Sequence, residues 1–277
     1  MLLNREAQWI LEEKYHGVET KEFYADLKRL EAGEPVDYII GFVEFAGCRI
    51  GLSYRPLIPR PETEQWTLEV IKALKNLPLT PSLLRRGEKP WVSPPYQGGA
   101  RGGGLDFRCL DLFSGSGCVG IALAKHVPNA TVDFGDIDER CLLQIKENLE
   151  TNAIPPERFR IFQSDVFSGI PVAETYALIC ANPPYINPAD AYSRVAESVK
   201  NFEPHGAVFA GEEGFEYIRK VLAHTKNFLL PGGRLYLEHD DIQKERIAEL
   251  LDEYGYGDFS FHKDHFGKWR RVMITKN

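Results

Sequence analysis

Residues 108 to 124 read RCLDLFSGSGCVGIALA, and this stretch decides the fold. The apolar run at 108–113 predicts a strand, and CVGIALA at 118–124 predicts a helix. Ser114, Gly115, Ser116 and Gly117 form the turn between them. Glycine lets a backbone pass close to a ligand, and the first N–H groups of a helix have no partner within it. The turn therefore predicts a binding site for a nucleoside cofactor, although a purely structural turn has the same sequence pattern.

Strands and helices alternate after this turn. The predicted parallel strands lie at 108–113, 130–136, 159–163, 176–182 and 233–239. Helices with one apolar face are predicted at 139–151, 214–229 and 241–254. Two late strands, 258–262 and 269–275, flank a turn at Gly267 and are expected to pair antiparallel. The fold class is therefore α/β, a Rossmann-like, doubly wound and mostly parallel sheet with a C-terminal antiparallel strand pair.

The chain before this turn contains segments of different character. Residues 5–31 predict two short helices separated by Gly17, so we treat 1–34 as a short N-terminal helical segment. Residues 35–277 form the predicted main domain. Within it, 35–60 hold a hairpin, with strand-like residues from Tyr38 and a turn at Ala46-Gly47, and then a Pro-rich extended approach to PETE. Residues 77–104 hold six glycines and five prolines without periodicity, and they predict a flexible surface insertion.

Acidic residues follow the next two strands. Asp136 ends the second strand, 19 residues after Gly117, where a carboxylate in such folds accepts hydrogen bonds from ribose hydroxyls. Asp165 follows the third strand, where it either accepts from an adenine amine or forms a turn. An acid at 136 also suits NAD, but the G-x-G-x-x-G spacing that binds a pyrophosphate is absent. The pattern therefore favours a nucleoside without phosphates, such as S-adenosyl-L-methionine.

The fourth strand ends in Asn182-Pro183-Pro184-Tyr185, at the sheet edge where open α/β folds bind ligands. The prolines remove two N–H donors, Asn182 adds an acceptor oxygen, and Tyr185 adds a flat ring. An amide nitrogen shares its lone pair with its carbonyl and is a poor nucleophile. Acceptors at Asn182 and Pro183 would hold both hydrogens of a planar NH2 group and stabilise positive charge on its nitrogen. The motif predicts methyl transfer to such a nitrogen without a metal; a Pro-rich turn without chemistry is the alternative.

The composition of the 277 residues narrows the function further. A formal net charge of -7 argues against direct nucleic-acid binding, which usually requires a basic surface. Five cysteines form no C-x-x-C pair, so neither a disulfide framework nor a zinc site is predicted. No run approaches the roughly 18 apolar residues that span a bilayer, so we expect no membrane contact and a cytoplasmic location.

Taken together, the motifs resemble the HemK/PrmC family, the protein-(glutamine-N5) methyltransferases. The resemblance rests on N-P-P-Y at 182–185, D-x-x-S-G-S-G at 111–117, IPRPETE at 58–64, Phe202-Glu203-Pro204 and LLPGGRLYLEH at 229–239. It covers residues 36 to 275 apart from the insertion. The fold that it implies is that of a class I S-adenosylmethionine-dependent methyltransferase.

The resemblance also implies a reaction and its residues. S-adenosyl-L-methionine is the implied methyl donor, and the acceptor is the glutamine of a Gly-Gly-Gln tripeptide in a class 1 peptide chain release factor. The implied cofactor-binding residues are Phe113, Ser114, Gly115, Ser116, Gly117, Asp136, Asp165, Val166 and Asn182. The implied catalytic residues, which hold the glutamine amide, are Asn182, Pro183, Pro184 and Tyr185.

Two features depart from the family pattern. Phe113 stands where the family turn usually has glycine. The N-terminal helical domain, which helps dock the release factor in bacterial members, is reduced here to the segment 1–34.

Other interpretations fit parts of the pattern. An amino-methyltransferase acting on an exocyclic amine of adenine or guanine in DNA or rRNA needs the same receptor, but the acidic charge opposes it. A cofactor-binding regulator without catalysis is opposed by the intact Asn182 and Tyr185. Glu62 and Glu64 either line the entrance to the site or start a helix. His239, at the end of a strand, is expected to be a structural histidine with satisfied hydrogen bonds.

Overall fold

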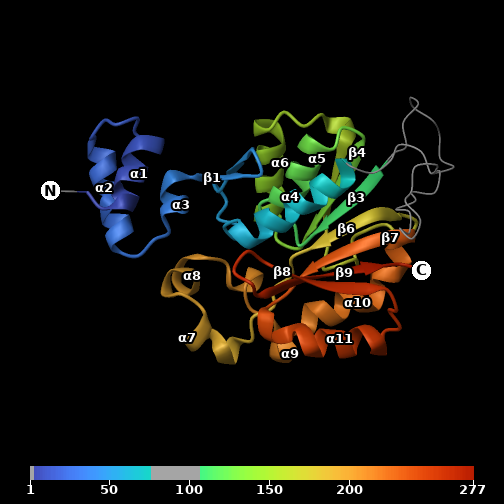
Figure 1. Cartoon of the computed structure of the whole chain (residues 1–277). Coiled ribbons are helices and arrows are strands. Elements are labelled where there is room, and N and C mark those ends of the chain that lie inside the picture. The colour runs from blue at the N-terminus through green and yellow to red at the C-terminus, as the bar shows by residue number, and fades with distance from the viewer. Residues whose placement is uncertain (1–2, 76–106) are drawn as a thin grey trace.

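A computed structural model describes residues 3–75 and 107–277, and it has the predicted α/β architecture (Figure 1). The predicted insertion at 77–104 lies outside the described residues. The main sheet has the order β5 (Phe159–Gln163), β4 (Ala130–Asp136), β3 (Phe107–Leu112), β6 (Tyr176–Ala181), β7 (Leu229–Glu238), β9 (Trp269–Thr275) and β8 (Phe259–Lys263). β9 runs antiparallel to both of its neighbours, and the other pairings are parallel. The chain order reverses between β3 and β6, which places a ligand crevice at their carboxyl ends.

Helices cover both faces of this sheet (Figure 1). One face packs against α4 (Pro61–Lys75), α5 (Cys118–His126) and α6 (Glu139–Thr151). The other packs against α10 (Glu216–Phe228) and α11 (Lys244–Glu253). Shorter helices are α7 (Ala191–Arg194), α8 (Glu197–Phe202) and α9 (Gly211–Gly214), with 3-10 turns at Pro156–Arg158, Pro188–Asp190, His205–Ala207 and Asp241–Gln243. None of the helices within the two described ranges is long and apolar enough to cross a membrane.

Several predicted bounds differ from the structure; the predicted helix 241–254, for example, is a 3-10 turn at Asp241–Gln243 followed by α11, which ends at Glu253. The predicted helix 214–229 begins at Glu216, because Gly214 has φ +92 and a Cβ there would lie 2.4 Å from the Tyr185 carbonyl oxygen. The strand predicted at 233–239 already begins at Leu229, and its pairing with β6 shifts register after Tyr176. The strands at 130–136, 159–163 and 269–275 and the helix at 139–151 have the predicted bounds.

The N-terminal region contains one helix that the sequence pattern did not predict. The two expected helices are α1 (Arg5–Glu13) and α2 (Lys21–Glu31), and the expected hairpin is β1 (Phe42–Phe45) with β2 (Cys48–Gly51). The strand-like interpretation from Tyr38 was wrong, because 36–40 form the short helix α3 (Val36–Ile40). Pro35 precedes this helix, and Gly41 ends it at φ +97.

Helix α3 and the hairpin connect the N-terminal helices to the rest of the molecule. Ile39 and Ile40 of α3 pack with the buried side chains of α1 and α2, whereas Tyr38 packs with Leu52 and Ile58. The hairpin is attached to α6 by Asn148, which is 0% exposed. Its Oδ1 accepts from the Gly51 N–H (2.7 Å), and its Nδ2 donates to the carbonyl of Ser116 (2.9 Å). One amide thus joins the hairpin to the turn after β3.

Candidate functional site

A cavity of about 330 Å³ lies at the carboxyl ends of β3, β4 and β6. This volume is within the range of about 300 to 1,000 Å³ that is usual for small-molecule sites. The predicted cofactor residues that line it are Phe113, Ser114, Gly115, Ser116, Asp136, Asp165, Val166 and Asn182, and Pro184 lines it as well. Gly117 does not line the cavity but is the N-cap of α5.

The turn after β3 is shaped by three residues in the left-handed region, which are Phe113 (φ +59), Gly115 (φ +54) and Gly117 (φ +80). The Gly117 N–H donates to the Ser114 carbonyl at 2.7 Å and closes the turn. A Cβ at Gly117 would lie 3.1 Å from Cγ1 of Ile145, whereas the space above Gly115 is open. The backbone of Gly115 is therefore free to approach a ligand closely.

Phe113 occupies a backbone conformation that glycine adopts without strain. For a residue with a Cβ, this left-handed conformation costs about 1 to 2 kcal/mol relative to the right-handed one. The ring lines the cavity and packs edge to face with Tyr217, with centroids 5.6 Å apart and planes at 77°. The departure from the family pattern at this position thus leaves the turn intact and adds an aromatic wall to the cavity.

Asp136 connects the turn to the edge of the cavity. Its Oδ2 accepts from the Gly115 N–H at 2.8 Å, and its Oδ1 accepts from the Asp138 N–H at 3.0 Å. Burial raises the pKa of this carboxyl group. Asp138 is the N-cap of α6, as its side chain accepts from the Arg140 N–H. Asp165 is exposed at the cavity rim, and its Oδ2 lies 3.9 Å from Nζ of Lys220.

Asp111 is a cavity residue that the sequence-based site did not include. It lies in β3 within the D-x-x-S-G-S-G pattern, which was the available signal. Its Oδ2 accepts from the Gly120 N–H at 2.9 Å, and its side chain is almost fully buried. Burial raises the pKa of Asp111 to about 8. A carboxyl group with such surroundings favours a cationic ligand group beside it.

A second cavity of about 270 Å³ adjoins the first. Asn182 lines both cavities, whereas Pro183 and Tyr185 line only the second. The structure thus divides the predicted N-P-P-Y residues between two spaces that meet at Asn182. Glu238 and Arg60 also line the second cavity, and neither was among the predicted site residues.

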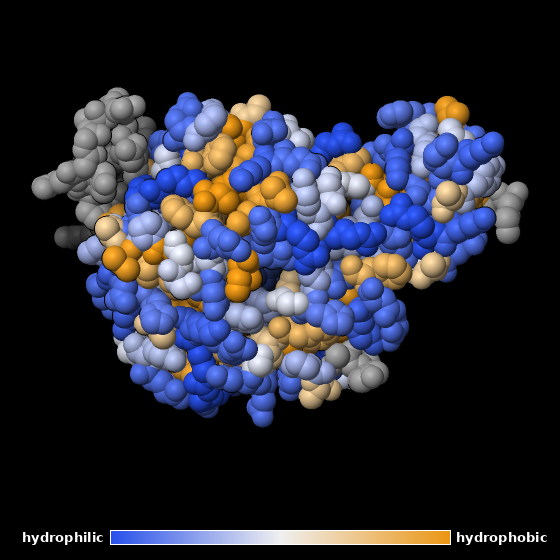
Figure 2. All heavy atoms as spheres, turned by 180° about the vertical axis from the view of Figure 1, so that it is seen from behind, coloured by the Kyte–Doolittle hydropathy of each residue, from blue (hydrophilic) through white to orange (hydrophobic). Residues whose placement is uncertain are grey.

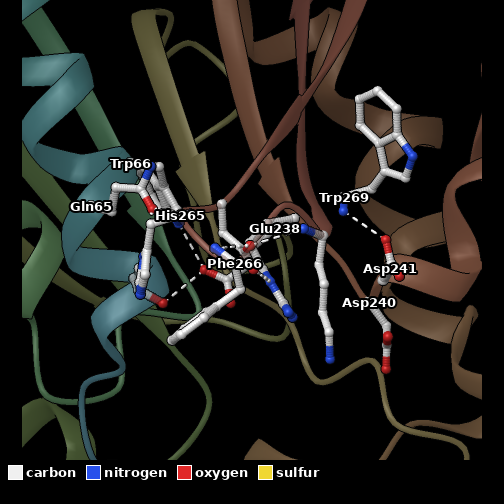
Figure 3. A network of polar contacts seen from close by, with 12 residues as sticks. Gln65, Trp66, Glu238, Asp240, Asp241, His265, Phe266 and Trp269 are labelled. Carbon is white, nitrogen blue, oxygen red and sulfur yellow. Dashed lines mark hydrogen bonds and ion pairs between the residues drawn. The ribbon is translucent and has the colours of Figure 1, made fainter.

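Glu238, at the end of β7, is the centre of a buried polar cluster (Figure 3). Its Oε2 accepts from Trp66 Nε1 and from Thr63 Oγ1, both at 2.7 Å, and its Oε1 accepts from the Tyr185 hydroxyl at 3.1 Å. Asn182 Nδ2 donates to Thr63 Oγ1 at 3.3 Å. Burial raises the pKa of Glu238. These contacts fix the ring of Tyr185 and one end of the Asn182 amide.

Two segments of the family pattern that are distant in sequence meet at Glu203. Its carboxylate accepts from the Ile58 N–H at 3.1 Å and from the Arg60 guanidinium at 2.6 Å. This contact holds the Pro-rich approach against the segment that follows α8. Arg60 lines both cavities.

The open questions about Glu62, Glu64 and His239 have structural answers. Helix α4 begins at Pro61, and Glu64 accepts from the Ala46 N–H at 2.7 Å, so it anchors the hairpin. Thr63 between them lines the cavity, whereas neither glutamate does. His239 is 0% exposed, and burial lowers its pKa to about 4. Its Nδ1 contacts the Asp240 carbonyl at 2.7 Å, but its Nε2 has no partner among the described residues, so its hydrogen bonds are only half satisfied.

Sequence comparisons relate this chain to known methyltransferases. Residues 104–209 match the family model of the methyltransferase small domain. The chain is 31% identical to the release factor glutamine methyltransferase of Rhodopirellula baltica over 90% of this chain and 76% of that protein. It is 32% identical to the release factor glutamine methyltransferase of Streptococcus pneumoniae over 92% of this chain and 80% of that protein.

A solved structure supports the fold. The 16S rRNA methyltransferase RsmC of T. Thermophilus, in complex with AdoMet and guanosine, has a TM-score of 0.54 and 18% identity, covering 85% of this chain and 50% of that one. The similarity in sequence to the two bacterial enzymes extends over most of each chain. The chain therefore belongs to the family of release factor glutamine methyltransferases.

Proposed function

We propose that this chain transfers a methyl group from S-adenosyl-L-methionine to the side-chain amide nitrogen of the glutamine in a Gly-Gly-Gln segment of a class 1 peptide chain release factor. The observation that carries the proposal is that two cavities meet at Asn182. One cavity has the turn and acids that suit a nucleoside, and the other has the acceptors that suit an NH2 group. A transferred group would pass between them over a short distance.

The residues of the first cavity fit the proposed cofactor, which supplies an electrophilic methyl group on a sulfonium. Asp136 would accept from the ribose hydroxyls, and the open backbone at Gly115 would contact the ligand closely. Asp111 would face the ammonium of the methionine part, since a buried carboxyl gains most from a cation beside it. Asp165 and Val166 would lie by the adenine.

The second cavity would hold the glutamine amide by its two hydrogens. Asn182 Oδ1 and the Pro183 carbonyl oxygen accept no hydrogen bond from the described residues. They would accept the two N–H groups, draw electron density onto the nitrogen and hold it in line with the methyl group. The bound cofactor would supply the methyl group to this nitrogen, and the nitrogen would release one of its two protons to solvent. Tyr185 would pack against the flat amide.

The remaining parts of the proposal concern the whole chain. Residues 35–277 would carry out the reaction, and the helical segment 1–34 would contribute to docking of the release factor. A cytoplasmic location follows from such a substrate. We expect no direct binding of nucleic acid, given the net charge of -7.

A labelling experiment tests the proposal. Purified protein with methyl-labelled S-adenosylmethionine is incubated separately with a release factor, with DNA and with rRNA. We expect label only on the release factor, and none when its Gly-Gly-Gln glutamine is replaced by alanine. The Asn182→Ala variant should lower kcat by about 100-fold or more, and its affinity for the cofactor should fall much less. Label on DNA or rRNA instead would favour the nucleic-acid alternative.

A further inference from the structure

The contacts around Glu238 have a direction that the distances alone do not reveal. Indole Nε1–H is only a donor, so Glu238 Oε2 acts as the acceptor of the bond from Trp66. Thr63 Oγ1 donates its single hydrogen to the same oxygen at 2.7 Å.

The donor role of Thr63 toward Glu238 determines the direction of the hydrogen bond between Thr63 and Asn182. With its hydrogen given to Glu238, the Thr63 hydroxyl has only lone pairs left for Asn182. The amide group that faces it at 3.3 Å must then be the NH2 end, Nδ2, and not the oxygen. The opposite end of the amide, Oδ1, is without a partner among the described residues, and Asn182 lines both cavities.

We propose that Glu238 and Thr63 are positioning residues that set the orientation of the Asn182 amide, so that its oxygen and not its NH2 group faces the substrate. This inference rests on the proposed function. A flipped Asn182 would present two donors to the two donors of a glutamine NH2 group. The buried carboxyl group of Glu238, 2% exposed, accepts from Trp66, Thr63 and Tyr185 and keeps this flip unfavourable through Thr63.

The same polarity determines which side chain the second cavity accepts. An NH2 group finds two acceptors there, Asn182 Oδ1 and the Pro183 carbonyl oxygen, whereas the oxygens of a glutamate carboxylate in the same position would face these lone pairs; the cations that also line this cavity are Arg60 and Arg194. The Thr63 hydroxyl, one turn before Thr67 on α4, thereby contributes to discrimination between an amide and an acid without contacting the substrate.

Replacement of Thr63 by valine tests the inference, because valine keeps the shape and removes the hydroxyl. With a release factor as substrate and saturating cofactor, we expect Thr63→Val to lower kcat by roughly 10- to 100-fold with a smaller change in KM, since the acceptor is no longer oriented. Thr63→Ser retains the hydroxyl and should restore most of the turnover. Thr63→Ala serves the same purpose as valine if the latter disturbs folding.

Thr67→Val is the matched control. Thr67 is equally buried on the same helix, and its Oγ1 donates to the Thr63 carbonyl at 2.7 Å, outside the path to Asn182. We expect this variant to keep the wild-type kcat and the wild-type affinity for S-adenosylmethionine, measured by calorimetry. Thr63 lines the first cavity, so kcat of its variants is compared at a cofactor concentration shown to be saturating for each. Equal kcat values for Thr63→Val, Thr63→Ala and Thr67→Val would overturn the positioning role and leave the proposed function in place. A wild-type protein that labels no release factor would overturn the proposed function and this inference with it.

Discussion

The carboxyl group of Asp111 lies in surroundings that oppose its charge, and this has a consequence for stability. Its pKa in the folded protein is about 8, above the ordinary value of 3.8, because burial disfavours the charged form. Between these pH values the folded protein binds a proton that the unfolded chain has lost. The stability that this group contributes is therefore present at low pH and falls as the pH rises through this window.

Replacement of Asp111 by asparagine should reveal this effect. Asparagine keeps an acceptor for the Gly120 N–H and removes the charge. Without cofactor, we expect Asp111→Asn to unfold with a free energy higher than that of wild type by about 1 kcal/mol or more near pH 8.5, with little difference near pH 4. Urea denaturation at several pH values measures this. If the free energy of unfolding changed with pH by the same amount in the two proteins, the raised pKa of Asp111 would be contradicted. The variant should also bind the cofactor more weakly, which would separate stability from function at one position.

At the scale of elements, the hairpin, α6 and the turn after β3 depend on one another through Asn148. Asn148→Ala would leave the Gly51 N–H and the Ser116 carbonyl without their buried partner. We expect a loss of about 2 to 3 kcal/mol in the free energy of unfolding. Asn152→Ala is the matched control, because this amide bonds Arg49 of the same hairpin at an exposed position. It should lose about 1 kcal/mol or less, and equal losses in urea denaturation would show that the bridge has no special role.

The elements also show where sequence patterns are sufficient. Strands and helices with a clear period and a polar boundary, such as 130–136 and 139–151, have the predicted bounds. Helix α3 was not predicted, because two isoleucines in a five-residue element show no helical period. Its packing against α1 and α2 decides its conformation. Local signals were present in Pro35 and Gly41, but the apolar run beyond them favoured a strand.

The site also contains residues that the sequence predicts and contacts that it does not. The turn at 113–117 and the N-P-P-Y residues are contiguous in sequence, and each carries its own pattern. The contact between Thr63 and Glu238 joins residues 175 positions apart, so no local pattern indicates it. Glu238 belongs to LYLEH at the end of a strand, which marks an edge of the sheet but not a partner. The hydrogen-bond direction that orients Asn182 appears only when the two segments are packed together.

At the scale of the whole molecule, α1 and α2 lie at one end, away from the seven-stranded sheet (Figure 1). On the face opposite to that view, this end is mainly hydrophilic, with scattered apolar atoms (Figure 2). Trp9 of α1 is 45% exposed, and a partly exposed tryptophan is typical of residues that dominate binding interfaces.

Replacement of Trp9 tests whether this end docks the release factor. We expect Trp9→Ala to raise KM for the release factor about fivefold or more, corresponding to about 1 kcal/mol, with kcat and cofactor affinity unchanged. Leu68→Ala is a control of matched exposure, since Leu68 on α4 is 46% exposed. Steady-state kinetics compare the two variants. A similar KM for both would indicate that the N-terminal helices take no part in docking.

The left-handed backbone at Phe113 also offers a route to engineered selectivity. Phe113→Gly would remove an aromatic wall of the cavity while relieving strain, whereas Phe113→Ala would open the same space and keep a Cβ at φ +59. We expect the glycine variant to unfold with a free energy higher by about 1 kcal/mol than that of the alanine variant. It should also accept a cofactor analogue with a bulky substituent that the wild-type cavity excludes, as measured by label transfer to the release factor. Exclusion of such analogues by both variants would contradict the role of the ring as a wall. In a cell extract, a tagged cofactor that fits only the enlarged cavity would be used by this one methyltransferase. The tag would then mark its substrates and not the substrates of other methyltransferases.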